Sequence, residues 1–482
     1  MKGNGFMYDI AIIGAGVVGG AIARELSRYD LKIVILEKEN DVCVGTSKAN
    51  SGIVHAGYDP EENTLMAKLN VQGNKMFDDI SRELSVPFKR NGSLVIAFSD
   101  EQLEHIEKLK QRGISNGVPH LTILSKEELL AKEPAINPEA KGALFAPTAG
   151  IIDPMLLTIS LIENAVMNGA ECLLNFDVAA IEKTANGYTI ISENNRVDAK
   201  YVVNAAGVFT DKVHNMVSEP AFKIIPGRGQ YFLLDKETSG IVNSTIFPCP
   251  TKTSKGILIV PSVHNNVMVG PTAEDDIGRE SLDTTEEMLE SASAGARLLV
   301  PNVSAWRNNI RTFAGLRAIS DQEDFIIKEV EDAPNFIDVA GIKSPGLAAA
   351  PAIGLYVVSI IKETGLKLNP KKSFDKAVNR KLFIDRTKEE QATLIKENPL
   401  FGRVVCRCEN ITEGDIVDAI NSKVGATTMD GVKRRCRAGM GRCQSGFCGP
   451  KVQQILAREL NLPLEEIVLE KNSSYILTGK TK

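Results

Sequence analysis

The chain has 482 residues, 43% of them hydrophobic and 24% charged, which is ordinary for a globular protein of about two to four domains. The net charge of −5 argues against nucleic acid or an anionic membrane as the main partner. The N-terminal sequence MKGNGFMYDI lacks the long apolar run of a signal peptide, so no secretion signal is expected.

The chain opens with a βαβ pattern. Apolar runs predict strands at residues 8–13 and 32–36, and the spacing between them predicts a helix at residues 17–28. Residues 63–133 are mostly typical of helices, with one strand near residues 93–97.

A strand–helix return at residues 158–174 leads to an apolar strand at residues 201–205. Residues 222–270 contain short strands with alternating side chains, which favours an antiparallel sheet forming a second layer. The strand at residues 336–340 and a helix after Gly346 return to α/β character.

The most apolar late stretch, residues 348–361, is too short to span a bilayer and is interrupted by Pro351 and Gly354. We therefore expect no transmembrane segment, while peripheral contact with a membrane stays open. A polar, Lys-rich segment at residues 367–381 indicates a boundary, and a shorter helical passage follows to Glu397.

The C-terminal part differs from the rest of the chain in charge. Residues 400–482 carry 13 Lys and Arg against 9 Asp and Glu, a net of +4, whereas the remainder has a net charge of −9. A separate module therefore begins near Gly402.

Gly14, Gly16 and Gly19 follow the first strand directly and open the first helix. Gly14 permits a tight turn, Gly16 lets a pyrophosphate approach the backbone, and Gly19 lets helix and strand pack closely. Glu37 ends the second strand, where a carboxylate can accept hydrogen bonds from ribose hydroxyls. This complete set of features predicts a dinucleotide site.

Two further segments favour FAD over NAD. Residues 46–52 form a small polar loop suited to wrapping a cofactor, and residues 201–207 form an apolar strand that ends in small residues. The chain resembles the D-amino-acid-oxidase-like flavoproteins, which include glycine oxidase, glycerol-3-phosphate dehydrogenase and L-2-hydroxyglutarate oxidase. The resemblance rests on the glycine motif and on Asn50-Ser-Gly-Ile-Val-His-Ala-Gly57, Val203-Asn-Ala-Ala-Gly207, Phe313-Ala-Gly-Leu-Arg317 and Gly341-Ile-Lys-Ser-Pro-Gly346.

The resemblance implies an α/β FAD-binding domain of the Rossmann-like, glutathione-reductase type with an antiparallel β-rich substrate domain. The implied boundaries are residues 1–365 for the oxidoreductase, with FAD segments at about 7–80, 150–215 and 310–365 and substrate segments at about 81–149 and 216–309. The residues expected to bind FAD are Gly14, Gly16, Gly19, Glu37, Lys38, Thr46, Ser47, Asn50, Ser51, Gly52, Val178, Ala205, Ala206, Gly207, Gly341, Gly346 and Leu347.

Five of the eight cysteines lie between residues 406 and 448, and this clustering favours metal ligation in a reducing cytoplasm over disulfides. Four thiolates could hold a 2Fe–2S cluster or zinc, and only the cluster could carry electrons away from a flavin. The segment resembles the bacterioferritin-associated-ferredoxin-like 2Fe–2S domain. That resemblance implies a mainly helical domain at residues 402–465, with a linker at 366–401 and a tail at 466–482. The implied ligands are Cys406, Cys408, Cys443 and Cys448, while Cys436 stands where Thr is expected.

Basic residues crowd beside these cysteines. They would offset the charge of four thiolates and could dock an acidic partner, or they could be a solvated helix end. The residues are Lys433, Arg434, Arg435, Arg437 and Arg442.

Oxidation of an alcohol by a flavin needs a base for the hydroxyl proton, and an anionic substrate needs a cation. Arg317 is the first candidate for the cation, because the Arg of this motif holds the substrate carboxylate in glycine oxidase-like relatives. Arg228 and Lys343 come second. His55 is the first candidate for the base or for a flavin contact, and His264 is the second. We interpret His105, His120 and His214 as structural.

The domain combination favours oxidation of sn-glycerol 3-phosphate to dihydroxyacetone phosphate, with electrons passing through a 2Fe–2S centre to a partner redox protein or subunit. The segment 50–57 also resembles L-2-hydroxyglutarate enzymes, so a 2-hydroxy acid is the main alternative. A non-catalytic electron-transfer subunit is the alternative from another class.

Overall fold

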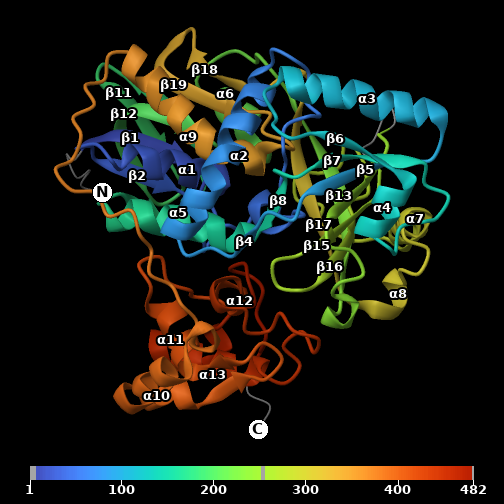
Figure 1. Cartoon of the computed structure of the whole chain (residues 1–482). Coiled ribbons are helices and arrows are strands. Elements are labelled where there is room, and N and C mark those ends of the chain that lie inside the picture. The colour runs from blue at the N-terminus through green and yellow to red at the C-terminus, as the bar shows by residue number, and fades with distance from the viewer. Residues whose placement is uncertain (1–6, 251–255, 480–482) are drawn as a thin grey trace.

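The computed structural model describes residues 7–250 and 256–479. Two large layered parts lie side by side, and a smaller C-terminal part lies below them (Figure 1). The expectation of no signal peptide rests on residues 1–10, of which residues 1–6 lie outside the described chain.

The first part is built on a mixed sheet whose central strands are parallel. β1 lies between β12 and β2 and runs parallel to both, and β12 is also parallel to β19. β2 is buried throughout, as expected for a parallel strand covered on both faces. The strands are β1 (Met7–Ile13), β2 (Ile33–Leu36), β9 (Glu171–Leu173), β10 (Ala180–Thr184), β11 (Gly187–Ile191), β12 (Arg196–Asn204), β18 (Ile326–Val330) and β19 (Ala333–Ala340).

Four long helices accompany this sheet. α1 packs against α5 and α9, and α2 packs against α9. The predicted βαβ unit at the start of the chain is confirmed by β1, α1 and β2. The hairpin of β10 and β11 was not foreseen by the sequence analysis. The helices are α1 (Val17–Leu26), α2 (Leu65–Glu83), α5 (Pro154–Met167) and α9 (Gly346–Glu363).

The helix α9 corrects one expectation, because it continues through Pro351 and Gly354 instead of breaking there. Pro351 lies inside the helix, beyond the first four residues whose N–H groups lack helical partners, so it removes one hydrogen bond from the ladder. A Cβ at Gly354 would lie 2.8 Å from the carbonyl oxygen of Ala21, so the glycine lets α9 approach α1 closely. Packing between these two helices therefore fixes a segment whose composition alone suggests an interruption.

The second part is an eight-stranded sheet, antiparallel except where β14 runs parallel to β5. Its order is β17-β13-β16-β15-β14-β5-β7-β6. The predicted second layer of short strands is present, and the long strand β17 belongs to it through its pairing with β13. The strands are β5 (Ser93–Ala97), β6 (Thr122–Ser125), β7 (Gly142–Ala146), β13 (Ile224–Leu234), β14 (Thr245–Pro248), β15 (Leu258–Pro261), β16 (Val267–Gly270) and β17 (Asn309–Ser320).

Shorter elements complete these two parts. Residues 63–133 contain helices as predicted, and also two strands that were not predicted, β4 and β6. A small sheet is formed by β3 (Ile53–Val54), β4 (Phe88–Lys89) and β8 (Gly150–Ile152). The remaining helices are α3 (Asp100–Ser115), α4 (Lys126–Lys132), α6 (Thr210–His214), α7 (Glu286–Leu299) and α8 (Ala305–Asn308), with 3₁₀ turns η1 (Thr46–Lys48), η2 (Gly207–Phe209) and η3 (Lys236–Thr238).

The C-terminal part has its own buried core, which includes Cys406, Cys436 and Cys448. It follows the extended segment after α9 and lies beneath both larger parts (Figure 1). Its elements are η4 (Phe383–Asp385), α10 (Lys388–Glu397), η5 (Pro399–Gly402), β20 (Val404–Cys406), β21 (Ile411–Thr412), α11 (Glu413–Asn421), α12 (Met429–Cys436), α13 (Gly449–Leu460) and η6 (Leu464–Glu466).

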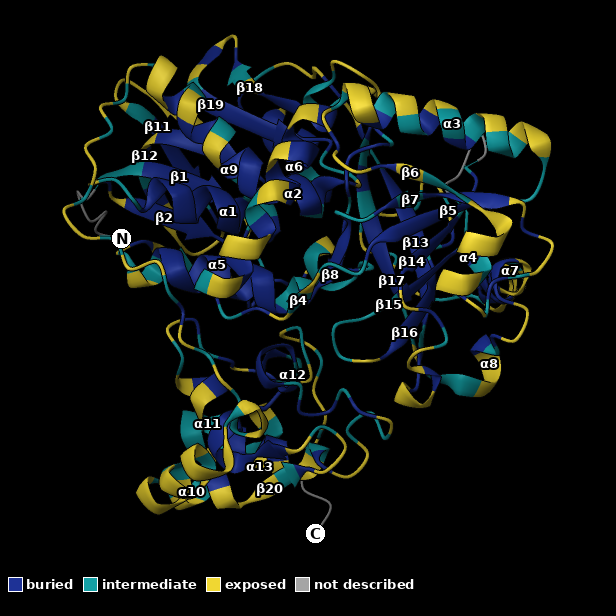
Figure 2. Ribbon diagram, in the orientation of Figure 1, coloured by how far each residue is buried: buried dark blue, intermediate teal, exposed yellow. Residues whose placement is uncertain are grey.

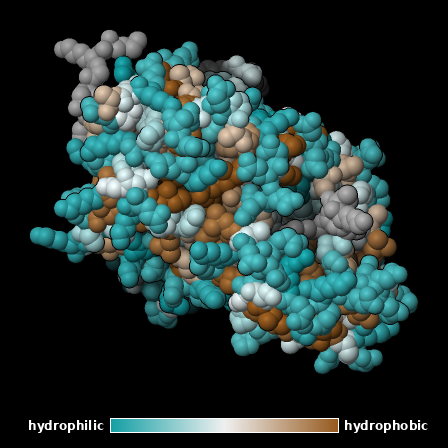
Figure 3. Space-filling model, turned by 90° about the horizontal axis from the view of Figure 1, so that it is seen from above, coloured by the Kyte–Doolittle hydropathy of each residue, from teal (hydrophilic) through white to brown (hydrophobic). Residues whose placement is uncertain are grey.

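Within the described residues, α9 is the one helix long and apolar enough to cross a membrane, and 61% of it is buried inside the protein. Figure 2 shows it among the dark blue elements of the first part. The face seen in Figure 3 is mostly hydrophilic, with hydrophobic patches near its middle. A core helix passes the same length and composition test, so α9 is weak evidence for a membrane span.

Candidate active site

A cavity of about 940 Å³ lies where the carboxyl ends of β1 and β2 meet the second sheet. Its size is in the range expected for a cofactor together with a small substrate. Fourteen of the seventeen residues expected to bind FAD line it, and the three that do not are Gly19, Gly52 and Gly341. The assignment of these residues to FAD stays a prediction.

The glycine turn after β1 is tightly enclosed. Gly14 has φ +107°, and a Cβ there would lie 2.5 Å from the carbonyl oxygen of Ala205. A Cβ at Gly19 would lie 2.0 Å from the carbonyl oxygen of Gly14. The glycines therefore let the backbone of the turn pack directly against the carbonyl groups of Ala205 and Gly14. The turn leads into α1, and the N-terminus of this helix favours an anion in the cavity.

Glu37 is anchored at the end of β2 by backbone donors. The N–H of Ala15 donates to its Oε2 at 2.8 Å, and the N–H of Glu39 donates to its Oε1 at 3.1 Å. Burial raises the pKa of the Glu37 carboxyl. Lys38 turns toward Glu280 instead, with Nζ 3.3 Å from Oε1. A fixed carboxyl group beside the glycine turn fits a ribose and thereby the ADP half of FAD.

The loop at residues 46–52 is held by its own side chains. Ser47 Oγ accepts from the N–H of Val17 at 2.9 Å, and Thr46 Oγ1 donates to the carbonyl oxygen of Leu316 at 2.6 Å. Asn50 Oδ1 accepts from the N–H of Gly52 at 2.8 Å. These bonds tie the loop to α1 on one side and to β17 on the other, so it closes the cavity between the two sheets.

His55 lies in the cavity wall, and α2 fixes its backbone. The carbonyl oxygen of His55 accepts from the side-chain amides of Asn70 and Asn74 at 2.9 and 3.0 Å. Its Nε2 lies 3.2 Å from the Oγ of Ser344, in the segment after β19. The imidazole therefore lies between the β3 segment and the loop that leads into α9.

Arg317 also lines the cavity, on β17. Its Nη2 donates to the carbonyl oxygen of Thr272 at 2.9 Å, and within the described residues no carboxylate forms an ion pair with it. Lys343 lines the cavity as well. The structure therefore brings His55, Arg317 and Lys343 to one cavity, and their roles stay predictions.

Two other candidates lie outside this cavity lining. Arg228 is held by Glu274, with Nη2 2.9 Å from Oε1, and by Asp283, with Nη1 2.7 Å from Oδ2. His264 Nε2 lies 2.9 Å from Asp153 Oδ2. Burial opposes the ionised Asp153, but the hydrogen bond from His264 contributes to lowering the pKa of this carboxyl. Both candidates already have internal partners.

Tyr231 was missed by the sequence analysis. It lines the cavity from β13 and stacks on Phe313 of β17, with ring centroids 4.7 Å apart and planes at 7°. Burial raises the pKa of its phenol. Tyr231 lies three residues after Arg228 and therefore on the opposite face of the strand, which is the one signal that could have found it.

The four predicted ligand cysteines approach each other in two pairs. Cys408 Sγ lies 3.7 Å from Cys443 Sγ. The pKa of the Cys406 thiol is lowered to about 6 by its hydrogen bond with Cys448 and by backbone N–H groups, against the effect of burial. In the part of the chain that the structure describes, no group of three or more candidate ligands is arranged around a single ion. Two thiol pairs fit a two-iron cluster better than one zinc ion.

Cys436 differs from these four. It donates to the carbonyl oxygen of Val432, one helical turn earlier, at 3.3 Å, and burial raises the pKa of its thiol to about 12. These contacts fit an inert thiol. All eight cysteines are free, and the cytoplasmic location stays a prediction.

The basic residues near the cysteines are all paired with internal carboxylates. Arg434 and Arg435 are buried against Asp41, so their interpretation as a surface for an acidic partner is wrong. The other pairs are Lys433 with Asp430, Arg437 with Glu409, and Arg442 with Asp235 and Glu237.

Comparisons with known proteins identify the families of both parts of the chain. The family described as FAD dependent oxidoreductase matches residues 9–360, and the BFD-like 2Fe–2S binding domain matches residues 404–458. The chain is 52% identical to a glycerol 3-phosphate dehydrogenase of Caloramator mitchellensis, over 99% of both chains. It is 32% identical to the human mitochondrial L-2-hydroxyglutarate dehydrogenase, over 55% of this chain and 61% of that one.

Among solved structures, an L-alpha-glycerophosphate oxidase of Mycoplasma pneumoniae with FAD bound superposes with a TM-score of 0.74. It is 34% identical, and the match covers 78% of this chain and 99% of that one. The chain therefore belongs to the family of FAD-dependent oxidoreductases and carries a BFD-like 2Fe–2S binding domain after the oxidoreductase part.

Proposed function

We propose that this oxidoreductase converts sn-glycerol 3-phosphate to dihydroxyacetone phosphate. The observation that carries the proposal is the 52% identity, over 99% of both chains, to a glycerol 3-phosphate dehydrogenase. The cavity supports it, because it combines a cation, an imidazole and space for a small anionic alcohol.

Arg317 binds the phosphate of the substrate in this proposal. A planar guanidinium can donate two parallel hydrogen bonds to a phosphate, and Arg317 has no carboxylate partner among the described residues that would compete. Lys343, which also lines the cavity, is a second cation for the same anion.

His55 accepts the proton of the substrate hydroxyl at Nε2. When Nδ1 carries the ring proton, Nε2 has the lone pair, and the substrate hydroxyl would replace the Ser344 hydroxyl, 3.2 Å away, as its donor. Bound FAD would supply the acceptor for the hydride of the carbon that bears the hydroxyl. Loss of one proton and one hydride converts the alcohol to the ketone.

The cysteine module gives the electrons a route out of the protein. Cys406, Cys408, Cys443 and Cys448 would hold the 2Fe–2S cluster, and a redox protein or subunit would accept its electrons. The approach of these thiols in two pairs and the family match at residues 404–458 support this route.

We also infer that the first sheet with its helices is a Rossmann-like FAD-binding domain of the glutathione-reductase type. The parallel strands β12, β1 and β2, with the glycine turn at their carboxyl ends, support this assignment. We place the oxidoreductase at residues 1–365, the linker at 366–401, the mainly helical cluster domain at 402–465 and the tail at 466–482.

Anaerobic titration of the purified yellow protein tests the substrate. We expect sn-glycerol 3-phosphate to bleach the flavin at a lower concentration than L-2-hydroxyglutarate. Bleaching by the 2-hydroxy acid alone would contradict the proposal and favour the alternative, which rests on the 32% identity to the human enzyme. Bleaching by neither would favour a different substrate or the non-catalytic alternative.

A further inference from the structure

Asp41 connects the FAD-binding part to the cysteine module through a buried ion cluster. It lies in the loop after β2, outside the lining of the cavity. Its Oδ1 accepts from Arg435 at 2.7 Å, and its Oδ2 accepts from Arg434 at 2.7 Å and from Arg435 at 2.8 Å. Both arginines belong to α12 of the cysteine module. The side chains of Arg435 and Asp41 are 0% and 1% exposed.

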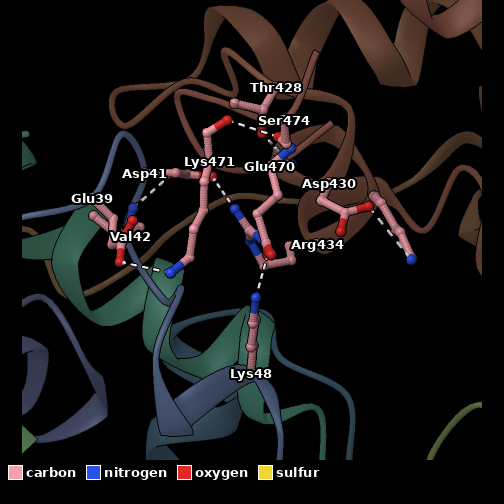
Figure 4. A network of polar contacts seen from close by, with 12 residues as sticks. Glu39, Asp41, Val42, Lys48, Thr428, Asp430, Arg434, Glu470, Lys471 and Ser474 are labelled. Carbon is pink, nitrogen blue, oxygen red and sulfur yellow. Dashed lines mark hydrogen bonds and ion pairs between the residues drawn. The ribbon is translucent and has the colours of Figure 1, made fainter. Parts of the chain in front are cut away.

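The C-terminal tail extends the same cluster. Glu470 accepts from Arg434 Nη1 at 2.7 Å and also pairs with Lys48, while Lys471 Nζ lies 3.4 Å from Glu39 Oε1. Figure 4 shows Lys48 reaching Glu470 and Lys471 reaching Glu39 across the boundary between the two parts. Lys48 belongs to the loop that closes the cavity, so the tail is attached to the same structure that encloses the cofactor site.

The geometry of the Asp41 contacts fixes an orientation. A guanidinium that donates two parallel bonds to one carboxylate is held in a plane, unlike two charges that only attract each other. Burial opposes ionisation, but the neighbouring Arg435 and Arg434 lower the pKa of the Asp41 carboxyl. Two buried cations that lost this carboxylate would be strongly destabilised, so α12 has one favourable position.

The segment after α12 carries Cys443 and contacts the second sheet. Arg442 Nη1 lies 2.6 Å from Glu237 Oε1, and Arg311 Nη1 donates to Gln444 Oε1 at 3.2 Å. Arg311 belongs to β17, the strand that also contributes to the cavity wall. A module held at Asp41 therefore presents a cysteine loop beside the strand that leads to the flavin cavity.

We propose that Asp41 is a positioning residue that locks the cysteine module in one orientation against the FAD-binding part. The module is then a fixed relay for electrons and does not swing on the segment between α9 and α11. This inference rests on the proposed electron route, and its tests separate the docking from that route.

Hydrogen exchange of the protein as purified, with flavin and iron content measured, tests the docking. In Asp41→Asn we expect exchange at residues 429–436 and 468–472 to rise at least about tenfold, since protection there depends on local opening. The control is Asp9→Asn, which breaks the partly exposed ion pair between Asp9 on β1 and Lys200 on β12, far along the chain from the module. Lys48→Gln, which removes one contact of the cluster, should give a smaller rise. Exchange equal to that of the wild type in Asp41→Asn would overturn the proposal.

Rapid mixing with sn-glycerol 3-phosphate tests the positioning role. In Asp41→Asn we expect the flavin to be reduced at the wild-type rate and the cluster absorbance to bleach at least tenfold more slowly. Cluster bleaching at the wild-type rate despite faster exchange would overturn the role of Asp41 in electron transfer. If the wild-type flavin is not reduced at all, the proposed function fails, and the exchange measurement still decides the docking.

Discussion

Arg317 and Arg228 lie on the paired strands β17 and β13, yet their surroundings differ completely. Arg317 faces the cavity and donates to a backbone carbonyl, whereas Arg228 is neutralised by Glu274 and Asp283. A cation that already has two carboxylate partners gains little from a substrate anion. The comparison teaches that the partner of a side chain, more than its motif, separates a binding residue from a structural one.

The same contrast holds for other residue types. His55 faces the cavity beside Ser344, while His264 is bonded to Asp153. His55 and Arg317 therefore line the cavity, whereas His264 and Arg228 lie outside its lining and pair with carboxylates. Substitution of one residue in a contrasting pair breaks or sharpens this comparison.

The largest effect is expected from substitution of a ligand cysteine. Cys443→Ser should remove the cluster iron, about two irons per chain, because four thiolates hold a 2Fe–2S cluster. Cys436→Ser should keep the iron, because that thiol donates to a helix carbonyl. Iron analysis of anaerobically purified variants checks both. Zinc in the wild-type protein, or loss of iron in Cys436→Ser, would contradict the ligand assignment.

The second effect concerns the two imidazoles. His55→Ala should slow anaerobic flavin reduction by about 10²–10⁴, the usual contribution of a general base. His264→Ala should leave that rate within about threefold of the wild type and lower the melting temperature, because it removes a partner of a buried carboxylate. Stopped-flow absorbance gives the rates. Should His55→Ala reduce its flavin at the wild-type rate, the base is another residue.

Sequence patterns predict the local features of this molecule. The strand, glycine turn and helix at the start of the chain are predictable because hydrophobic periodicity and glycine spacing act over a few residues. The partners of Arg228 are not, since Glu274 and Asp283 lie 46 and 55 residues away in the chain. Pairing between residues that lie far apart in the chain decides which cations are neutralised. This pairing cannot be inferred from a single sequence.

The C-terminal module shows the same limit. Its cysteine spacing predicts a cluster site, but the sequence leaves open whether the basic residues beside the cysteines offset the thiolate charge, dock an acidic partner or form a solvated helix end. The structure pairs Arg434 and Arg435 with Asp41, which lies more than 390 residues away. A buried arginine and an exposed one have the same letter in the sequence. Only the fold therefore shows that Arg434 and Arg435 are buried.

The third prediction tests the two arginines directly. Arg317→Ala should raise the half-saturating concentration of sn-glycerol 3-phosphate by roughly 30-fold or more, because a buried charged hydrogen bond typically contributes about 2–5 kcal/mol. Arg317→Lys should lose much of the same affinity, since the planar fork is lost. Steady-state kinetics with an artificial electron acceptor measures these changes.

Arg228→Lys is the matched comparison for Arg317→Lys. It should lower the melting temperature with little change in half-saturation, because Arg228 holds Glu274 and Asp283 and does not line the cavity. An equal rise in the half-saturating concentration for both Lys variants would show that the different partners of Arg317 and Arg228 do not determine which of them binds the substrate.

The smallest effect is expected at His214, which we interpret as structural. Its Nδ1 lies 2.6 Å from Asp338 Oδ2, and its Nε2 lies 3.0 Å from the carbonyl oxygen of Glu219. The hydrogen bond with Asp338 raises the pKa of His214 above the ordinary 6.5. The folded protein therefore binds this proton more tightly than the unfolded chain does, and the stabilisation is complete below pH 6.5.

As pH rises through the folded pKa of His214, that stabilisation is lost. The wild-type protein should lose more stability between about pH 6 and pH 9 than His214→Gln does, while the substitution itself costs about 1.5–3 kcal/mol at the lower pH. Urea unfolding at both pH values measures the difference, with His120→Asn, at an exposed position, as the control. Parallel pH profiles for wild type and His214→Gln would mean that the imidazole is neutral in its buried position. The contact with Asp338 would then be an uncharged hydrogen bond.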